Sequence, residues 1–126
     1  MLEANKDAVR RYFDERWNKR NYSIVDELDA TGGDPEEHKA WIKSVHDGFS
    51  QFEVTLDHII AEGDRVALHW TVSGVLTRPY DEFGDRPDNV VGSAGDRIAV
   101  PGLALLRIAD GRVVDDIAYP GKPILS

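Results

Sequence analysis

The C-terminal part of the chain predicts a β-hairpin, and this prediction constrains the fold more than any other feature. Residues 100–121 read VPGLALLRIADGRVVDDIAYPG, in which two largely apolar runs flank Asp110-Gly111. Asp-Gly favours the positive φ angles that a tight hairpin turn needs. Successive strand residues point to opposite faces, so only one of Asp115 and Asp116 can enter a given pocket. A carboxyl group in an apolar cavity is an acid/base candidate, because desolvation raises its pKa. The alternative is that both acids are solvated at a strand end.

Composition narrows the class of protein. The 126 residues are enough for one domain with a substantial core. A net charge of −8 argues against nucleic acid as the main partner, because phosphate binding needs a basic surface. The absence of cysteine excludes disulfides and zinc–thiolate sites and is compatible with a cytoplasmic location. No apolar run approaches the roughly 20 residues that span a bilayer, so no membrane association is expected. The four histidines show no metal-binding spacing, so no metal site is expected.

Helices are expected in the first part of the chain. Residues 4–19 carry apolar side chains at helical spacing, and a short helix is expected at residues 22–28. Asp34-Pro35 starts a third helix that ends near Gly48. Arg16 falls on the apolar face of the first helix, and its head is expected to reach water. The alternative is an inward guanidinium that pairs with an acid or a ligand.

Strands are expected after the helices. From Phe52 onward the period of the pattern is two, and the alternating set is Phe52, Val54, Leu56, His58 and Ile60. A second strand is expected at residues 65–77, a long loop at 78–95, and two further strands at 97–108 and 112–119. Helices followed by an antiparallel meander indicate an α+β fold. A bent sheet wrapped against helices leaves a concave pocket, the usual place for a small ligand.

Three segments carry a resemblance to a known family: KDAVRRYFDERWN near the start, HKAWIKSVHDGFSQFEVTLDHIIAEGDRVALHWTVSG in the middle and VPGLALLRIADGRVVDDIAYP at the end. They resemble the SnoaL-like polyketide cyclases of the nuclear transport factor 2-like superfamily. The resemblance implies a single domain over residues 1–126, with a cone-shaped curved antiparallel sheet packed against N-terminal helices. It also implies a homodimer formed through the outer face of the sheet. The fold hosts enzymes and noncatalytic binders alike.

The chain departs from the family at several positions. Alignment of the R-I-x-D-G turn puts Ala104 and Ala118 where the cyclases have an inward His and an inward Asp. Tyr12 matches the helix-one Tyr of ketosteroid isomerases. Relatives also have about ten more residues after the second helix, forming a short strand, whereas here Leu28 runs directly into Asp29. Either the protein lost that strand or the chain was shortened; the loss would expose a sheet edge and favour self-association.

The candidate site residues follow from this register. Asp116 shares strand parity with Ala118 and is expected to face the cavity as acid or base, and the Tyr12 hydroxyl is expected to donate to a substrate carbonyl. The alternative for Asp116 is a structural ion pair with an arginine, and for the aromatic residues ordinary core packing. Trp70 is expected inward and His69 outward, with the reverse register as the alternative. His38 is expected to be a satisfied core or helix-end histidine, with a pocket role as the alternative, and His46 and His58 are expected at the periphery. The expected substrate-binding residues are Trp17, Trp41, Val45, Phe49, Trp70, Ala104, Leu106 and Ala118.

Two functions remain open from the sequence. The first is a cyclase or isomerase without a cofactor, acting on a hydrophobic carbonyl compound such as a polyketide, with Asp116 as acid/base. The second is a noncatalytic binding or scaffold domain, favoured by the two alanines at the family's catalytic positions. A third interpretation, an altered chain whose main property is dimerisation or swapping, depends on the missing strand.

Overall fold

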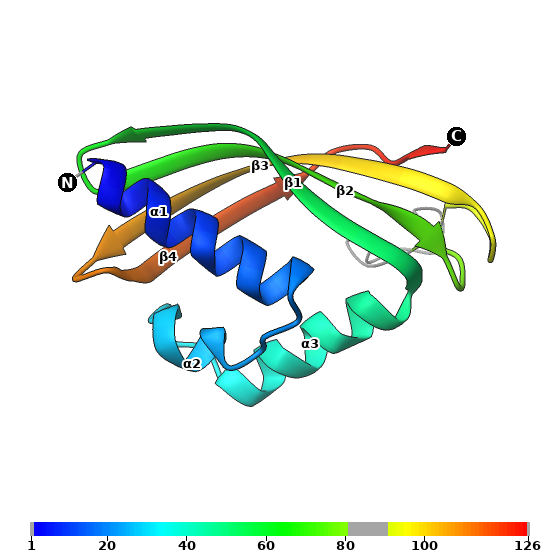
Figure 1. Ribbon diagram of the computed structural model, residues 1–126, viewed down its shortest axis with the longest axis horizontal. Coiled ribbons are helices and arrows are strands. Elements are labelled where there is room, and N and C mark those ends of the chain that lie inside the picture. The colour runs from blue at the N-terminus through cyan, green and yellow to red at the C-terminus, as the bar shows by residue number, and fades with distance from the viewer. Residues whose placement is uncertain (1, 81–90, 126) are drawn as a thin grey trace.

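The computed structural model describes residues 2–80 and 91–125, and its helices cover one face of a curved antiparallel sheet (Figure 1). The strands lie in the order β1-β2-β3-β4, and β5 pairs with β3. This is the α+β architecture that the sequence predicts. The elements are α1 (Leu2–Phe13), η1 (Asp14–Asn18), α2 (Ile24–Leu28), α3 (Pro35–Asp47), β1 (Phe49–Glu62), β2 (Arg65–Leu76), β3 (Arg97–Ala109), β4 (Arg112–Pro120) and β5 (Ile124–Leu125).

The first helix does not continue as an α-helix to residue 19. After Phe13 it widens into the π-helical segment η1, where the Lys19 N–H donates to the Asp14 carbonyl at 2.9 Å. A π-turn holds an extra residue and rotates the side chains that follow, and such turns are frequent at functional sites. Both Arg16 and Trp17 are buried there, with 4% and 7% of their surfaces exposed. The expectation that the Arg16 head reaches water is therefore wrong.

The third helix begins and ends where the sequence predicts. Asp34 is its N-cap, and its carboxylate accepts a hydrogen bond from the Glu36 N–H at 2.9 Å. Pro35 is the first helical residue, where a missing N–H costs nothing, and Gly48 follows the last turn. The helix lies beneath the sheet (Figure 1), and its buried residues are Ile42, Val45 and His46.

A bulge in β1 interrupts the alternation of inward and outward residues that the sequence predicts. The pairing with β2 shifts between Leu56 and His58, which leaves Asp57 as an extra residue. Leu56 packs against the core, but beyond the bulge the core-facing residues are Ile59 and Ala61. Ile60 is 67% exposed on the outer face. His58 and Ile60 therefore do not continue the face of Phe52, Val54 and Leu56.

The β3–β4 hairpin has the predicted turn, with φ of 53° at Asp110 and 75° at Gly111. A second register shift follows, since Ile108 pairs with Val113 and Arg107 pairs with Asp115, leaving Val114 as the extra residue. Beyond the bulge, the buried Leu106 lies opposite Asp116. The long loop expected at 78–95 is held at its base by an isolated bridge between Tyr80 and Val91; residues 81–90 lie outside the described residues.

The segment after α2 pairs with the beginning of β4. Asp29 forms an isolated parallel bridge with Val113, and the Ala30 N–H donates to the Val113 carbonyl at 2.7 Å. The Arg112 side chain donates to the carbonyl oxygens of Glu27 and Asp29, both at 3.2 Å. The edge of β4 is therefore covered at its beginning, and Asp29 is brought beneath the sheet.

Candidate functional site

A cavity of about 330 Å³ lies between the helices and the inner face of the sheet. Most of its wall is aromatic or aliphatic, and its charged residues are Arg16, Asp29, Asp115 and Asp116. Both acids of β4 thus line the cavity, which corrects the expectation that only one of them enters the pocket. The lining residues are Phe13, Arg16, Trp17, Asp29, Thr31, His38, Trp41, Val45, Phe49, Phe52, Val54, Trp70, Val72, Tyr80, Asp115, Asp116 and Ala118. An apolar pocket with a few polar groups is the usual form of a small-molecule site.

Aromatic rings from four elements form the apolar wall. Trp17 meets Trp41 edge to face, with ring centroids 5.5 Å apart, and meets Phe52 at 5.8 Å. Trp70 lies against its cross-strand partner Gly102, where an added Cβ would stand 2.1 Å from the indole ring. Only glycine leaves room for this ring. Edge-to-face pairs of this kind are rigid and suit a flat, hydrophobic ligand.

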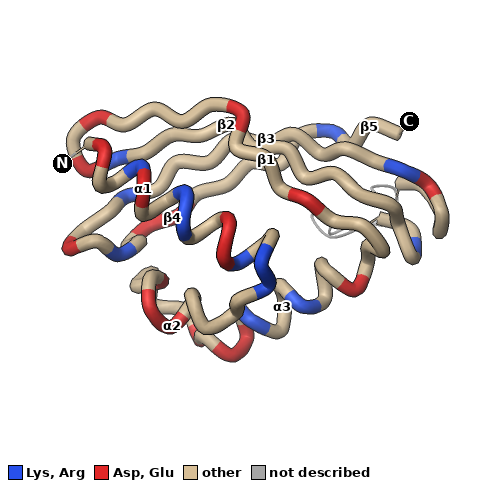
Figure 2. The backbone as a smooth tube through the Cα atoms, viewed as in Figure 1, with Lys and Arg blue, Asp and Glu red and all other residues tan. Residues whose placement is uncertain are grey.

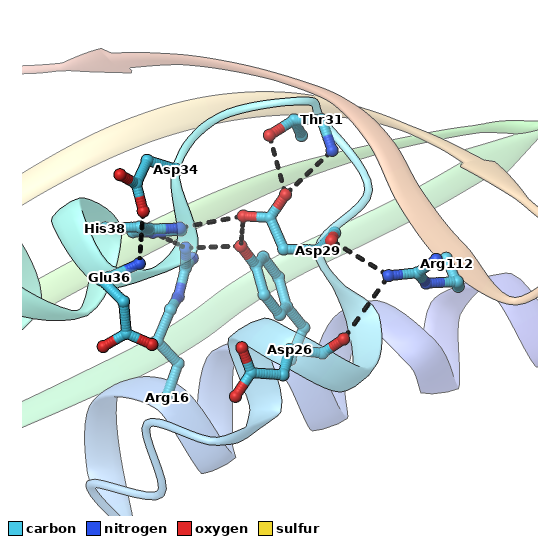
Figure 3. A network of polar contacts seen from close by, with 9 residues as sticks. Arg16, Asp26, Asp29, Thr31, Asp34, Glu36, His38 and Arg112 are labelled. Atoms are coloured by element: carbon cyan, nitrogen blue, oxygen red, sulfur yellow. Dashed lines mark hydrogen bonds and ion pairs between the residues drawn. The ribbon is translucent and has the colours of Figure 1, made fainter.

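A closed ring of polar contacts forms the other end of the cavity (Figure 3). The Arg16 Nη1 donates to the Tyr12 hydroxyl at 3.0 Å, and that hydroxyl donates to Asp29 Oδ2 at 3.0 Å. The same Nη1 lies 3.2 Å from His38 Nε2, and His38 Nδ1 lies 2.9 Å from Asp29 Oδ2. Four side chains from α1, η1, α3 and the segment after α2 thereby fix one another.

Asp29 is the anchor of this ring. Its Oδ1 accepts from the Thr31 N–H at 2.9 Å and from the Thr31 hydroxyl at 2.7 Å, while its Oδ2 faces Tyr12 and His38. Burial alone would raise the pKa of Asp29, but the hydrogen bonds of Thr31 and Tyr12 and the charge of His38 together lower it. Asp29 is therefore a fixed anion with both oxygens occupied.

The tautomer of His38 follows from its partners. A guanidinium has donors only, so His38 Nε2 accepts from Arg16 and the proton sits on Nδ1, where it is donated to Asp29. Burial and, after it, the charge of Arg16 lower the pKa of His38 from its ordinary value of 6.5. His38 is thus neutral at pH 7 and belongs to the cavity, which was the less expected of the two alternatives.

Asp116 faces the cavity from β4, as the sequence predicts. Its Oδ1 is buried and has no hydrogen-bond partner among the described residues. Desolvation is the main cause that raises its pKa; the charge of Arg16 opposes this, that of Asp29 adds to it, and His38 and Asp115 act more weakly in opposite directions. An unpaired carboxyl oxygen at the wall of an apolar cavity is the arrangement that acid/base chemistry needs.

The other predicted site residues fall into two groups. Trp17, Trp41, Val45, Phe49, Trp70 and Ala118 line the cavity beside Asp116. Tyr12, Ala104 and Leu106 are buried but do not line it. The Tyr12 hydroxyl is committed to Asp29 and Arg16, and the small Ala104 lies under the sheet surface. Trp70 points inward and the half-exposed His69 outward, as expected.

Sequence reasoning missed Asp29 and misplaced Arg16 and His46. The signal for Asp29 was the Asp-x-Thr pattern after a helix, which favours a carboxylate bonded to the residue two positions on. Arg16 had no clear signal, because a π-turn cannot be seen in helical periodicity. His46 was expected at the periphery, yet it is 2% exposed and its Nε2 lies 2.7 Å from the Trp17 carbonyl.

The described residues contain neither a metal-binding cluster nor a membrane-spanning helix. In residues 2–80 and 91–125, no cluster of three or more His, Asp or Glu side chains is arranged to hold a metal ion. None of the helices described is both long and apolar enough to cross a membrane.

The comparisons with known proteins agree with this architecture. Among solved structures, a protein assigned as a SnoaL-like polyketide cyclase from Jannaschia sp. CCS1 superposes with a TM-score of 0.73 at 22% identity, covering 95% of this chain and 87% of that one. AclR from Streptomyces galilaeus, assigned as a hydroxylase, gives 0.75 at 17% identity, covering 96% and 91%. TsrD from Streptomyces laurentii gives 0.74 at 19% identity, covering 95% and 90%.

At these identities the structural likeness establishes the fold alone. No curated protein matches the chain significantly. The sequence profile of the SnoaL-like domain matches residues 7–116, which is most of the chain and includes both Arg16 and Asp116. By this match and by its curved sheet over N-terminal helices, the chain belongs to the SnoaL-like family of the nuclear transport factor 2-like superfamily.

Proposed function

We propose that the protein is a cyclase or isomerase that moves a proton on a hydrophobic carbonyl compound, polyketide-like in its flat and apolar shape, without a cofactor. Its ligand occupies the cavity described above, with the aromatic wall around its apolar body and the polar ring near its carbonyl group. Several relatives of the same fold are named as polyketide cyclases, which supports the substrate class.

One observation carries the proposal: Asp116 lines an apolar cavity, and its buried Oδ1 has no hydrogen-bond partner among the described residues. As a carboxylate, Asp116 takes a proton from the carbon next to the carbonyl group, and the C–H electron pair moves into an enolate. In an isomerisation the Asp116 carboxylic acid returns the proton to another carbon. In a cyclisation the enolate carbon attacks a second carbonyl of the same molecule, and the new alkoxide takes the proton from Asp116. Its raised pKa brings this carboxyl closer to the working pH of a base.

Tyr12 takes a different part in this proposal from the one that the sequence favours. Its hydroxyl proton is donated to Asp29, and its oxygen accepts from Arg16, so it has no free proton for a substrate carbonyl. Burial is the main reason that the pKa of Tyr12 is raised, which keeps the phenol neutral. Tyr12 is therefore a positioning residue that holds Arg16 and Asp29 in place.

The test is a panel of flat hydrophobic ketones and polyketide-like compounds, screened by thermal shift and then for turnover. Asp116→Asn keeps the shape of the side chain and removes the base, so ligands should still bind while turnover falls about a hundredfold or more. Asp64→Asn, in the exposed turn between β1 and β2, removes one acid elsewhere and serves as the matched control. Undiminished turnover in Asp116→Asn would exclude this carboxyl as the base.

A noncatalytic binding domain is the second candidate, and one observation favours it. Ala104 and Ala118, at the positions of the cyclases' catalytic pair, are cross-strand partners in the β3–β4 hairpin. The family's own acid/base pair is thus replaced by two methyl groups side by side. Tight ligand binding with no turnover in any member of the panel, for the unaltered protein as for Asp116→Asn, would favour this function.

We further propose that the protein forms a homodimer through the outer face of the sheet. We also propose a cytoplasmic location, with which a chain without cysteine is compatible. The outer face carries exposed apolar side chains, including Ile60, Leu103 and Tyr119, which are 67%, 59% and 71% exposed. In β2 and β3 the charged residues lie only near the strand ends (Figure 2), and Asp57 of β1 lies beside His69 on this face. An exposed apolar patch of this kind is typical of a protein–protein interface.

A further inference from the structure

We infer that Arg16 binds the carbonyl oxygen of the substrate and carries the negative charge that develops on it. This inference rests on the proposed function and gives it a second catalytic residue. The sequence suggests Tyr12 as the group that binds the substrate oxygen, but its hydroxyl already bonds to Asp29 and Arg16. In this inference the guanidinium of Arg16 binds that oxygen instead. The cavity is therefore expected to bind flat apolar ligands that carry an enolisable carbonyl or an ionisable phenol at one end.

The geometry of the guanidinium supports this role. Its Nη1 makes both described hydrogen bonds, to Tyr12 and to His38. Its Nε is buried without a partner, and no described residue accepts a hydrogen bond from Nη2. Nη2 has no described acceptor and is not enclosed as Nε is, and Arg16 lines the cavity. The structure thus occupies Nη1, encloses Nε and leaves Nη2 as the charged donor that a ligand oxygen in the cavity can reach.

The charge of Arg16 is likewise not paired directly. No carboxylate of the described residues lies within ion-pair distance of Arg16; Asp29 reaches it only through Tyr12 and His38. Asp116 is near enough for each charge to affect the other, yet the two groups form no ion pair. Both line the same cavity. A ligand oxygen on Arg16 therefore places the neighbouring carbon of the ligand beside Asp116.

The surroundings keep the guanidinium in this place. Its carbon lies 4.0 Å from the ring centre of Tyr12, 5.0 Å from that of Phe13 and 5.2 Å from that of Trp17. Aromatic rings attract a cation and limit its motion, and with 4% of its surface exposed Arg16 has little water to satisfy it. Preorganised donors of this kind stabilise an oxyanion without reorganisation during the reaction.

The charges balance through the step. Before it, the site holds the Arg16 cation and the Asp29 and Asp116 anions; after it, Asp116 is neutral and the negative charge lies on the enolate oxygen beside Arg16. No charge is created or removed; it moves from Asp116 toward the guanidinium. The ring of Asp29, Tyr12 and His38 does not change protonation and holds Arg16 throughout.

The test uses substituted naphthols, which are flat, apolar and change their ultraviolet absorbance on ionisation. Asp116→Asn is the background, because its neutral amide mimics the protonated carboxyl that accompanies the enolate. In this background the naphtholate form should bind at least about tenfold more tightly than the neutral naphthol, which lowers the pKa of the bound naphthol by about one unit or more. The added substitution Arg16→Met should abolish this preference, and Arg16→Lys should keep only part of it.

Controls separate oxyanion binding from support of the fold. Lys43→Met removes an exposed cation from α3 that lies over the Tyr22 ring, and it should leave the preference unchanged. Circular dichroism and thermal unfolding check each variant, and if Arg16→Met does not fold, Arg16→Lys decides. The titratable groups around the guanidinium are Tyr12, Asp29, His38, Asp115 and Asp116; their own titration is subtracted with the ligand-free protein.

Two results would overturn the inference: equal or weaker binding of the naphtholate in the Asp116→Asn background, or a preference that survives Arg16→Met. Failure of every naphthol to bind would also overturn it, because the cavity would then not accept the proposed class of ligand. The proposed function fails separately, if turnover is independent of Asp116. A naphtholate preference without turnover would leave Arg16 as the anion-binding group of a noncatalytic binder.

Discussion

Both faces of the same sheet are apolar, but they differ in what covers them. The helices cover the inner face and form the cavity with it, whereas the outer face carries a groove of about 440 Å³ whose lining includes Ile60, Leu103 and Tyr119. On the inner face the apolar residues surround Asp116 and the ring of Arg16, Asp29 and His38. On the outer face Ile60, Leu103 and Tyr119 are exposed, and polar side chains such as His69 and Asp57 contact each other there while partly exposed. The contrast concerns the polar groups: those of the inner face are buried and hold one another in place, whereas those of the outer face remain open to solvent. Bulges at Asp57 and Val114 determine which residues belong to which face.

The largest effect on the fold is expected from Gly102→Val, which fills the inner face. A Cβ at this position would stand 2.1 Å from the Trp70 ring, so the indole must move and the cavity wall with it. We expect the free energy of unfolding to fall by about 1–3 kcal/mol or more, measured by urea unfolding, together with a change in tryptophan fluorescence.

The control for this substitution is Gly33→Ala. No atom lies within 4 Å of the Cβ that it would add, so its effect should stay within about 0.5 kcal/mol. Equal stability of Gly102→Val and the unaltered protein would contradict the close packing of Trp70 on β3.

The next effect concerns the outer face and assembly. Leu103→Glu places a charge in the centre of the exposed apolar patch and should convert the proposed dimer into a monomer, because an unpaired charge is costly to bury in an interface. Size-exclusion chromatography with light scattering measures the mass. The monomer should keep its helical and strand content, since the outer face contributes nothing to the cavity.

Ala40→Glu, at an exposed position of α3 away from this patch, adds the same single charge and serves as the matched control. It should leave the mass of the particle unchanged. A monomeric unaltered protein at high concentration would refute the dimer itself.

The boundary between the faces also marks what the sequence could predict. Element order, the Asp110-Gly111 turn, the N-cap at Asp34 and the inward Trp70 all follow from local rules of turns, caps and alternation. The bulges at Ser50, Asp57 and Val114 and the π-turn each break periodicity by one residue, and nothing in the pattern of apolar residues indicates such an insertion. For this reason Ile60 was placed on the wrong face, and Arg16 was expected in water.

Asp29 illustrates a second limit. Its position depends on contacts distant in sequence, above all the bridge to Val113 and the contact with His38, and no local pattern encodes these. Asp116, by contrast, was predictable from strand alternation, because Asp116 and Ala118 both lie beyond the bulge at Val114 and share one face. The sequence thus predicts the groups that a single strand or turn positions, and it misses those that three elements position together.

A smaller effect is expected from Asp116, whose buried carboxyl group serves the proposed reaction but lowers the stability of the fold. The pKa of Asp116 is raised in the folded state above its ordinary value of 3.8, chiefly by burial. As the pH rises, the unfolded state therefore loses this proton first. The free energy of unfolding falls between pH 3.8 and the folded pKa and stays lower at higher pH. Asp116→Asn should stabilise the protein at pH 7 by about 1.4 kcal/mol for each unit of that difference.

The advantage of Asp116→Asn should shrink as the pH falls toward 3.8, where both states hold the proton. Urea unfolding at a series of pH values measures this, with Asp64→Asn in the outer turn as the comparison. A destabilised Asp116→Asn at pH 7 would mean that the carboxylate is paired in the folded protein, against the unpaired Oδ1.

The smallest effect is expected from the histidines, and it tests the tautomer of His38. Its pKa is lowered in the folded state from 6.5, first by burial and then by Arg16, so the unfolded state binds this proton more readily. Stability from His38 is then fully present above pH 6.5 and is lost as the pH falls through the folded pKa. His38→Gln should make this loss shallower, whereas His58→Gln on the outer face should not change it. The slope that remains belongs partly to His46, whose pKa is also lowered by burial. An unchanged slope in His38→Gln would mean that folding does not lower the pKa of His38, which would contradict the hydrogen bond that its Nε2 accepts from Arg16.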